Sequence, residues 1–163
     1  MAKLFWVAVI LLAGVYGWGY ASLNESAAIH FLNDMETMTA NGDAQGLCDL
    51  LTDDMQVSIL DHTSGKDQVT TGGKAVACEQ IRSTAPAMAL LKATIEVQRE
   101  KLKVQRKLLK PWTMDVSYTE KRHTNVQRAG IELNTESEDK LTLIRTFSGV
   151  KIKYLASEAW LAD

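Results

Sequence analysis

The sequence predicts an α+β domain preceded by one apolar helix, and three observations support this prediction. Residues 4–20 contain no charged or strongly polar side chain. Between residues 24 and 91 most segments favour helices, because capping residues precede apolar positions at helical spacing. From Thr94 onward apolar and polar residues alternate, which is typical of half-buried strands. Helices followed by long strands predict a curved, mostly antiparallel sheet wrapped around about three helices.

The apolar run is nearly long enough to span a membrane as a helix. A helix over residues 4–20 spans roughly 25 Å at about 1.5 Å per residue, just under the roughly 30 Å hydrocarbon core of a bilayer. We therefore divide the chain into a transmembrane anchor or signal segment, 1–21, and a domain, 22–163.

Two interpretations of the segment remain open. Lys3 and the small residues of Gly19-Tyr20-Ala21 fit a signal peptide that is cleaved after Ala21, followed by secretion. Aromatic residues near both ends instead resemble the belts at membrane–water interfaces. We favour an uncleaved single-pass anchor, with the domain on the periplasmic, extracytoplasmic side of a bacterial inner membrane. The residues assigned to this anchor are Leu4, Trp6, Ile10, Leu12, Trp18 and Tyr20.

The charges are unevenly distributed. The net charge is −2, which argues against nucleic acid as the main partner. Residues 92–110 are nevertheless basic, with seven bases and two acids. This stretch is either a solvated face or a surface for anionic lipid or an acidic partner. Its candidate surface residues are Lys101, Lys103, Arg106, Lys107 and Lys110.

The two cysteines, Cys48 and Cys78, fall in segments that read as helices. In an exported domain they predict one disulfide, which would close a loop of about thirty residues. Two buried thiols are the alternative. The chain has no CxxC motif or His/Cys cluster, so we expect no metal site and no cofactor.

The helices follow in order. Asn24 or Ser26 can cap a first helix that runs to about Ala40, and Asn41-Gly42 ends it. Asp43 caps a second helix, 44–51, which a polar break at 52–54 separates from the next element. A third helix runs from about 74 to 91, and Pro86 is expected to end or kink it.

The strands are predicted by alternation. Residues 55–60 form the first strand, and Gly65 and Gly72-Gly73 mark a loop or short hairpin after it. The basic stretch favours a strand over a helix because Ile95 and Val97 are β-branched and alternate. Later strands contain residues 112–119, the apolar positions Leu141, Leu143 and Phe147, and residues 150–154 after a turn at Ser148-Gly149.

Several of these pieces occur in a familiar order. They are residues 41–43 before a short helix, residues 51–55 leading into a strand, residues 72–74 before the third helix, and the final hairpin, 139–145 with 149–155. In this order the sequence resembles the nuclear transport factor 2-like (NTF2-like) superfamily, the cone-shaped fold of ketosteroid isomerase and SnoaL. The resemblance covers roughly residues 24–160. It implies a pocket between three helices and a bent sheet, but it implies little about chemistry because this fold hosts enzymes, binding proteins and assembly modules alike.

An isomerase or dehydratase of this kind needs a base in an apolar pocket, with a hydrogen-bond donor opposite. Asp61 and His62, at the end of the first strand, are candidates for the base, and Tyr118 is a candidate for the donor. Asp115 lies on the opposite face of its strand from Tyr118, so both cannot enter the pocket. His30 and His123 are expected to be packing or solvated residues. All of these candidates are weak beside the simpler interpretation of a hydrated strand end.

The sequence contains no nucleophile elbow, P-loop, dinucleotide fingerprint or zinc-protease motif. We therefore favour a non-catalytic, membrane-tethered domain that binds a protein partner or a second copy, as an accessory subunit of an envelope complex. The alternative is a pocket for a small apolar ligand, with or without isomerase or dehydratase chemistry. A third possibility is binding to lipid through the basic stretch.

Overall fold

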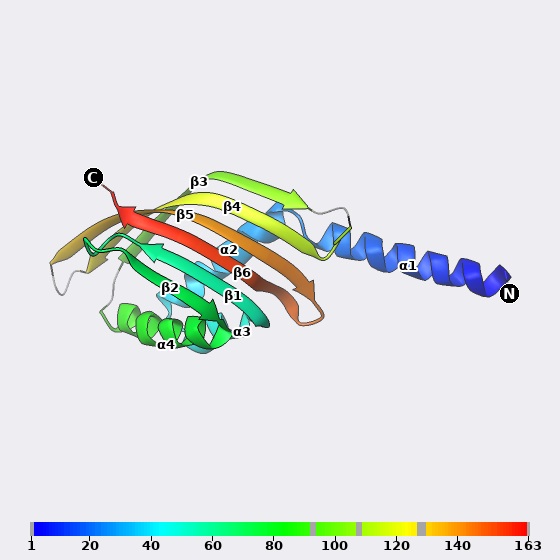
Figure 1. Ribbon diagram of the computed structural model, residues 1–163, viewed down its shortest axis with the longest axis horizontal. Helices are drawn as coiled ribbons and strands as arrows, with labels where there is room; N and C mark the ends of the chain where they lie inside the picture. Colours follow the sequence, from blue (N-terminus) through cyan, green and yellow to red (C-terminus); the bar gives the residue numbers. More distant parts are fainter. Residues whose placement is uncertain (1, 92–93, 107–108, 127–129, 163) are drawn as a thin grey trace.

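The computed structural model describes residues 2–91, 94–106, 109–126 and 130–162. It shows an N-terminal helix that projects from the domain and further helices packed on one side of a curved sheet (Figure 1). The helices are α1 (Ala2–Ser22), α2 (Glu25–Ala40), α3 (Ala44–Asp49) and α4 (Lys74–Leu90). The strands are β1 (Leu51–Asp61), β2 (Gln68–Gly73), β3 (Thr94–Arg106), β4 (Thr113–Val126), β5 (Ile131–Thr146) and β6 (Gly149–Leu161). The predicted α+β class is confirmed, with one mixed sheet.

The helix starts follow the caps that the sequence offers. The Asn24 side chain accepts a hydrogen bond from the Ala27 amide at 2.8 Å, so Asn24 rather than Ser26 caps α2. The Asp43 side chain accepts one from the Gly46 amide and caps α3. Gly42 between these helices has φ +70°, the left-handed conformation that glycine adopts without steric cost.

The six strands are ordered β2-β1-β6-β5-β4-β3. All neighbouring pairs are antiparallel except β1 and β6, which bring the first and last strands of the domain together in parallel. β3 carries an irregularity between Glu100 and Lys103, and Lys101 within it has φ +55°. A bulge of this kind bends a strand and increases its twist, which helps the sheet to curve over α2.

The core lies between α2, α3, α4 and the concave face of the sheet. Period-two alternation on β4 and β5 turns Met114, Val116, Leu141 and Leu143 inward, and all four are buried. Ile152 from β6 joins them. The same alternation continues along both strands. It places Tyr118 and Glu120 of β4, and Ser137 and Asp139 of β5, on the concave face that covers the helices.

Two predicted details were wrong, and a third was wrong in part. The second helix ends at Asp49, and residues 51–54 belong to β1 instead of forming a polar break, because Leu51 and Thr52 are buried at the start of the strand. Pro86 does not end α4, which continues to Leu90, so only a kink at Pro86 stays as a prediction. Phe147 lies in the turn after β5 and is wholly exposed, so it is no core residue of a strand.

Residues 4–20 belong to α1, which projects away from the domain (Figure 1). Among the described residues, no helix combines the length and the apolarity that crossing a membrane requires. The side chains of Ile10 and Trp18 are exposed on α1, whereas those of Leu4, Trp6, Leu12 and Tyr20 lie outside the described part.

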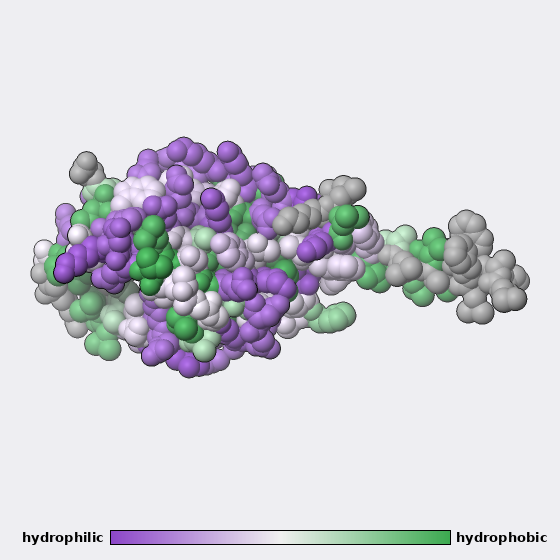
Figure 2. All heavy atoms as spheres, viewed as in Figure 1, coloured by the Kyte–Doolittle hydropathy of each residue, from purple (hydrophilic) through white to green (hydrophobic). Residues whose placement is uncertain are grey.

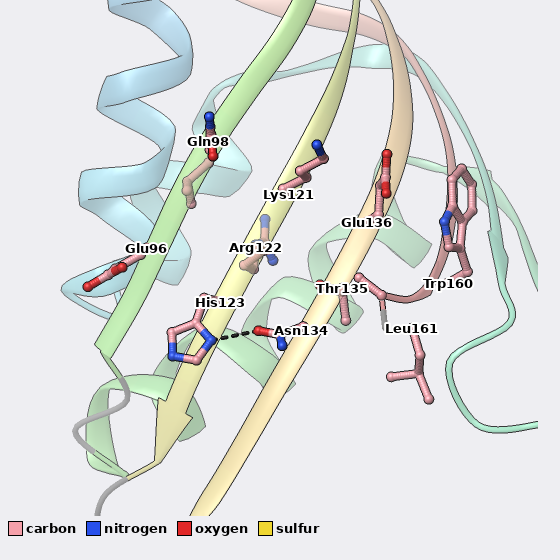
Figure 3. A pocket seen from close by; sticks show the side chains of 12 residues that line it. Glu96, Gln98, Lys121, Arg122, His123, Asn134, Thr135, Glu136, Trp160 and Leu161 are labelled. Atoms are coloured by element: carbon pink, nitrogen blue, oxygen red, sulfur yellow. Dashed lines mark hydrogen bonds between the residues drawn. The ribbon is translucent and has the colours of Figure 1, made fainter.

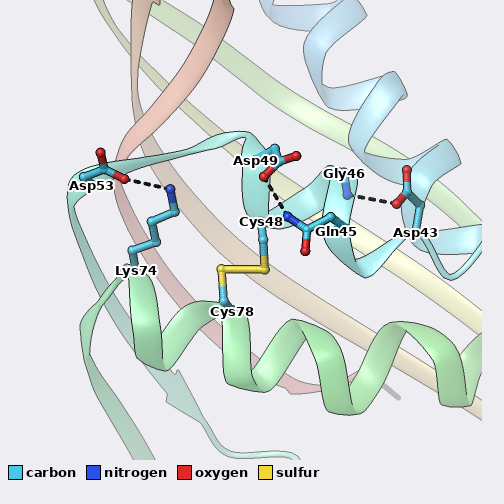
Figure 4. Close-up of a disulfide and its surroundings, with 8 residues drawn as sticks. All are labelled: Asp43, Gln45, Gly46, Cys48, Asp49, Asp53, Lys74 and Cys78. Atoms are coloured by element: carbon cyan, nitrogen blue, oxygen red, sulfur yellow. Dashed lines mark hydrogen bonds and ion pairs between the residues drawn. A yellow bond between two sulfur atoms is a disulfide. The ribbon is translucent and has the colours of Figure 1, made fainter.

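The predicted disulfide is present (Figure 4). Cys48 on α3 is bonded to Cys78 on α4, with 5.4 Å between their Cα atoms. The bond closes a 30-residue loop that contains β1 and β2. It links α3 to α4 beneath the sheet.

Candidate functional site

A row of polar side chains crosses the concave face of the sheet, where the apolar core ends. The β4–β5 register pairs Tyr118 with Asp139, and the β5–β6 register pairs Asp139 with Ser157. One step further along, Glu120 pairs with Ser137. Directly paired side chains on one face have Cβ atoms about 4.5–5.5 Å apart. The register therefore assembles residues from three strands into one cluster, which we call the interior row: Tyr118, Glu120, Ser137, Asp139 and Ser157.

Asp139 is the most unusual member of this row because it is a carboxyl group that is only 8% exposed. Burial raises its pKa, while hydrogen bonds from the hydroxyls of Ser157 and Ser137 act in the opposite direction. The Ser137 hydroxyl donates to Asp139 Oδ2 at 2.9 Å. The carboxyl group is thus held in place, and its proton affinity is higher than that of an exposed aspartate.

Tyr118 lies beside Asp139 and stays protonated. Burial raises the pKa of its phenol, and the nearby carboxylates Asp139 and Glu120 add to this effect. The guanidinium of Arg99 lies 6.0 Å from the centre of the Tyr118 ring. A neutral phenol in this position can donate a hydrogen bond to an acceptor in the space that it faces.

Glu120 has a structural role, because its carboxylate forms ion pairs with two arginines. Its carboxylate is 3.1 Å from Arg99 Nε and 2.6 Å from Arg122 Nη2. Arg99 also reaches Glu36 and Asn33 on α2, each at 3.1 Å. This network connects β3 and β4 to α2 and satisfies the charge of a carboxylate that is 5% exposed. Its geometry is that of a structural support for the interior row.

All members of the interior row except Ser137 line a cavity of about 250 Å³ between α2 and strands β1 and β3–β6. Apolar side chains form most of its wall, among them Leu32, Met35, Ile95, Val97 and Leu155. A second cavity of about 320 Å³ lies beneath α3 and α4. The two cavities share five lining residues, Met35, Thr39, Ile59, Arg122 and Leu155. The site is therefore a chamber with apolar walls whose polar lining comes from the interior row and from the charged side chains of Glu36, Arg99 and Arg122.

Asp61 and His62, the predicted candidates for a base, lie at the exposed end of β1. The Asp61 carboxylate accepts hydrogen bonds from the Thr63 amide and hydroxyl, which lower its pKa. His62 is 2.7 Å from Asp67 and 3.2 Å from Glu158, and these carboxylates raise its pKa. Neither residue lines the cavity that Tyr118 lines. The structure therefore does not bring the three candidates together.

The other singled-out residues also lie outside this cavity. His30 is exposed on α2, and Asp115 accepts a hydrogen bond from Thr142 on the outer face of the sheet. His123 pairs with Asn134 at 2.6 Å beside a wide outer hollow of about 710 Å³ (Figure 3). Lys121 in that hollow pairs with Glu100. No cluster of three potential metal ligands occurs within the described residues.

The predicted basic surface follows the edge strand β3. Lys101 and Lys103 are exposed on this strand, Arg106 is its last residue, and Lys110 lies in the connection to β4. Lys107 lies outside the described residues. Figure 2 shows hydrophilic side chains over much of the face of the domain in view.

The sequence prediction missed Asp139, Glu120 and their serine partners. Alternation offered a signal, since Ser137 and Asp139 precede the buried Leu141 and Leu143 in steps of two. A polar residue that continues the buried face of a strand is a candidate for the pocket. Alternation alone does not say which residues of other strands lie beside it, because strand register depends on contacts that are distant in sequence.

No family model matches the sequence, and none of the curated proteins does. Solved structures do match. An NTF2-like protein with a cystatin-like fold from Novosphingobium aromaticivorans aligns with a TM-score of 0.53 and 19% identity, over 85% of this chain and 88% of that one. A putative scytalone dehydratase from N. aromaticivorans DSM 12444 gives a TM-score of 0.60 and 10% identity, over 85% and 83%.

A third match is the beta subunit of a putative aromatic-ring-hydroxylating dioxygenase from the same strain, with a TM-score of 0.63 and 8% identity, over 85% and 90%. At these identities the likeness concerns the fold alone. The fold is NTF2-like, as the order of the sequence elements predicted, and it occurs both in a putative enzyme and in a subunit of a larger assembly.

Proposed function

We propose that the protein binds a small, largely apolar molecule carrying one oxygen-bearing group in the cavity between α2 and the sheet. The observation that carries this proposal is the pair of Tyr118 and buried Asp139 in a cavity of about 250 Å³, which apolar side chains line together with the ion-pair network of Glu120, Arg99 and Arg122. Ligand sites in proteins are typically concave and apolar, with a few converging polar groups. The interior row supplies such groups.

The chemistry of the pair favours a carbonyl, enol or phenol group. Tyr118 is a neutral donor, and Asp139, with its raised pKa, can accept or donate a proton closer to neutral pH than an exposed aspartate can. This combination suits proton transfer of the isomerase or dehydratase kind. The similarity of the fold to that of a putative scytalone dehydratase supports this direction. Glu120 is excluded from the role of base because Arg99 and Arg122 occupy its carboxylate.

The proposal is tested by titrating the full chain with 2-naphthol, a bicyclic phenol, and by measuring fluorescence or heat. Asp139→Asn and Tyr118→Phe each remove one polar group with little change in shape. Each is expected to weaken 2-naphthol binding by roughly five- to tenfold, the value of about one hydrogen bond. Binding of 2-methoxynaphthalene, which lacks the hydroxyl donor, is expected to change less in Asp139→Asn.

The matched controls are Asp61→Asn and His62→Gln, which alter a carboxylate and an imidazole outside the cavity. They are expected to leave the affinity unchanged. Equal affinities for all four variants, or absence of binding to the wild-type chain, would rule out the interior row as a ligand site. Mass spectrometry of the chain purified under native conditions adds an independent readout, since a retained small molecule would identify the natural ligand class.

A second candidate function is that of a membrane-associated accessory subunit on the extracytoplasmic side that binds a protein partner or a second copy. A specific observation favours it: α1 projects from the domain, and Val7, Ile10, Leu11 and Val15 on it are exposed and apolar (Figure 1). An exposed apolar helix needs lipid or protein to cover it. Cross-linking in intact cells tests this function. Recovery of the chain only as a soluble monomer that begins at Ser22 would exclude it.

A further inference from the structure

The end of the domain from which α1 leaves exposes several large apolar side chains. Leu109, in the connection from β3 to β4, is 93% exposed, and Phe147, in the turn from β5 to β6, is wholly exposed. Figure 1 shows both connections at the end of the sheet beside the base of α1. Trp18 and Trp112 are partly exposed at the same place. We call this surface of Trp18, Leu109, Trp112 and Phe147 the α1 end.

Close packing joins α1 to this surface. Gly19 is buried against the Trp112 indole, and a Cβ atom at Gly19 would lie 2.6 Å from Trp112 Cδ1, so a larger residue there would require the indole to shift. The guanidinium of Arg145 lies 5.6 Å from the centre of the Trp18 ring, a cation–π distance. The Arg145 amide also donates to the Trp112 carbonyl at 2.8 Å. The last turn of α1 thus contacts the α1 end through Trp112 and Arg145.

Positive charge accompanies the apolar side chains. Lys103 is exposed on β3, which runs toward this end, and Lys110 is exposed in the same connection as Leu109. Aromatic and aliphatic tips beside basic side chains suit the headgroup region of a bilayer, where rings enter the interface and lysines attract anionic lipids. The uncharged run of residues 4–20 leaves the domain from the same surface. One bilayer plane can therefore contact the helix and both connections together.

We propose that the α1 end rests on an anionic lipid bilayer, with Leu109 and Phe147 inserted among the headgroups and α1 entering the same bilayer. This inference rests on the proposed membrane association through α1 and adds the orientation of the domain. It also requires that α1 is retained, because cleavage after Ala21 would remove both Trp18 and Gly19. The domain would then sit close against the membrane instead of hanging from a loose tether.

The test uses the full chain with its disulfide intact in phosphatidylcholine vesicles with and without phosphatidylglycerol. Leu109→Cys and Phe147→Cys are labelled with an environment-sensitive fluorophore. Ile131→Cys is the matched control, because Ile131 is also apolar and exposed but begins β5 at the opposite end of the sheet (Figure 1). We expect a blue shift, at least a twofold rise in intensity and quenching by brominated lipid at positions 109 and 147. We expect none of these changes at position 131.

Vesicle flotation separates the two levels of the proposal. Protein that floats with the vesicles but shows no shift at positions 109 and 147 would overturn the orientation and leave membrane association intact. Protein that does not float would overturn both. Lys110→Glu tests the lipid class and is expected to reduce the fluorescence change several-fold in anionic vesicles only. An equal change in neutral and anionic vesicles would overturn the assignment to anionic lipid.

Discussion

Two polar clusters of similar composition occupy very different places in this molecule. The interior row joins the aromatic ring of Tyr118 to the carboxyl groups of Glu120 and Asp139 inside the cone. The cluster at the end of β1, which we call the rim cluster, joins the imidazole of His62 to Asp67 and Glu158, next to Asp61. In the first cluster burial raises the pKa of a carboxyl group. In the second cluster, hydrogen bonds from Thr63 lower the pKa of the Asp61 carboxyl group.

The difference shows that residue type alone does not identify a functional site, because the burial and the partners of a side chain determine its chemistry. A histidine next to an aspartate attracts attention in a sequence, yet His62 has two carboxylate partners at the surface and forms a solvated ion-pair group. Asp139 does not stand out in the sequence, because polar residues surround it there. In the folded sheet, however, its side chain points into the cavity. Low local dielectric makes the interior groups strongly coupled, whereas water screens the rim groups.

The largest expected effect comes from removing the support of the interior row. Glu120→Ala leaves Arg99 and Arg122 without the carboxylate that both contact. Breaking a buried charge network by deleting one partner typically costs 3–5 kcal/mol, and we expect about 3 kcal/mol here because Arg122 reaches solvent. Urea unfolding measures the change. Glu158→Ala, the rim counterpart, is expected to shift the unfolding midpoint too little to resolve. Equal losses for the two variants would contradict the distinction between the clusters.

The disulfide separates the clusters in a second way. The loop that Cys48 and Cys78 close contains β1, β2 and the rim residues Asp61, His62 and Asp67, whereas the interior row on β4, β5 and β6 lies outside it. Closing 30 residues is worth about 3–4 kcal/mol in the chain-entropy model. We expect reduction, or the double replacement Cys48→Ala and Cys78→Ala, to lower the melting temperature by several degrees.

Hydrogen exchange shows where that loss falls. Amides of β2 are expected to lose protection first, because β2 is an edge strand paired only with β1 in the described sheet. Amides of β4 and β5 around Tyr118 and Asp139 are expected to keep theirs. A uniform loss over all six strands would mean that the disulfide supports the interior row as much as the rim. An unchanged melting temperature after reduction would contradict its stabilising role.

Local signals predicted a large part of the fold. The caps Asn24 and Asp43, the glycine after α2, the alternation on β4 and the cysteine pair each act within a few residues or one element, and each appears in the structure as expected. The α1 segment was equally visible as an uncharged run, although its membrane role stays a prediction.

The site depended on information that local patterns do not contain. Asp139 meets Tyr118 through the β4–β5 register and Ser157 through the β5–β6 register. The parallel pairing of β1 with β6, which completes the cavity wall, joins residues about a hundred positions apart. His62 fits the simpler interpretation of a hydrated strand end, but its partner Glu158 could not be named from the sequence, because it is 96 residues away. Alternation indicates which residues of each strand face the cavity, but only the strand register determines which of them are neighbours.

The smallest expected effect gives the sharpest comparison, because its sign differs between the clusters. The pKa of Asp139 is raised in the folded chain, so Asp139 loses part of its contribution to stability as the pH rises from the ordinary value of 3.8 through the folded pKa. The pKa of Asp61 is lowered, so Asp61 contributes stability above 3.8 that disappears as the pH falls through its folded pKa. Measurements from about pH 2.5 to pH 7 cover both ranges.

The variants Asp139→Asn and Asp61→Asn remove these titrations while preserving shape. As the pH falls, the wild-type chain should gain stability relative to Asp139→Asn and lose stability relative to Asp61→Asn, and the two difference curves should have opposite slopes. Urea unfolding at matched ionic strength measures both curves. If both curves slope in the same direction, Asp139 is solvated like Asp61, and the cavity loses the one group whose chemistry sets the interior row apart from the rim.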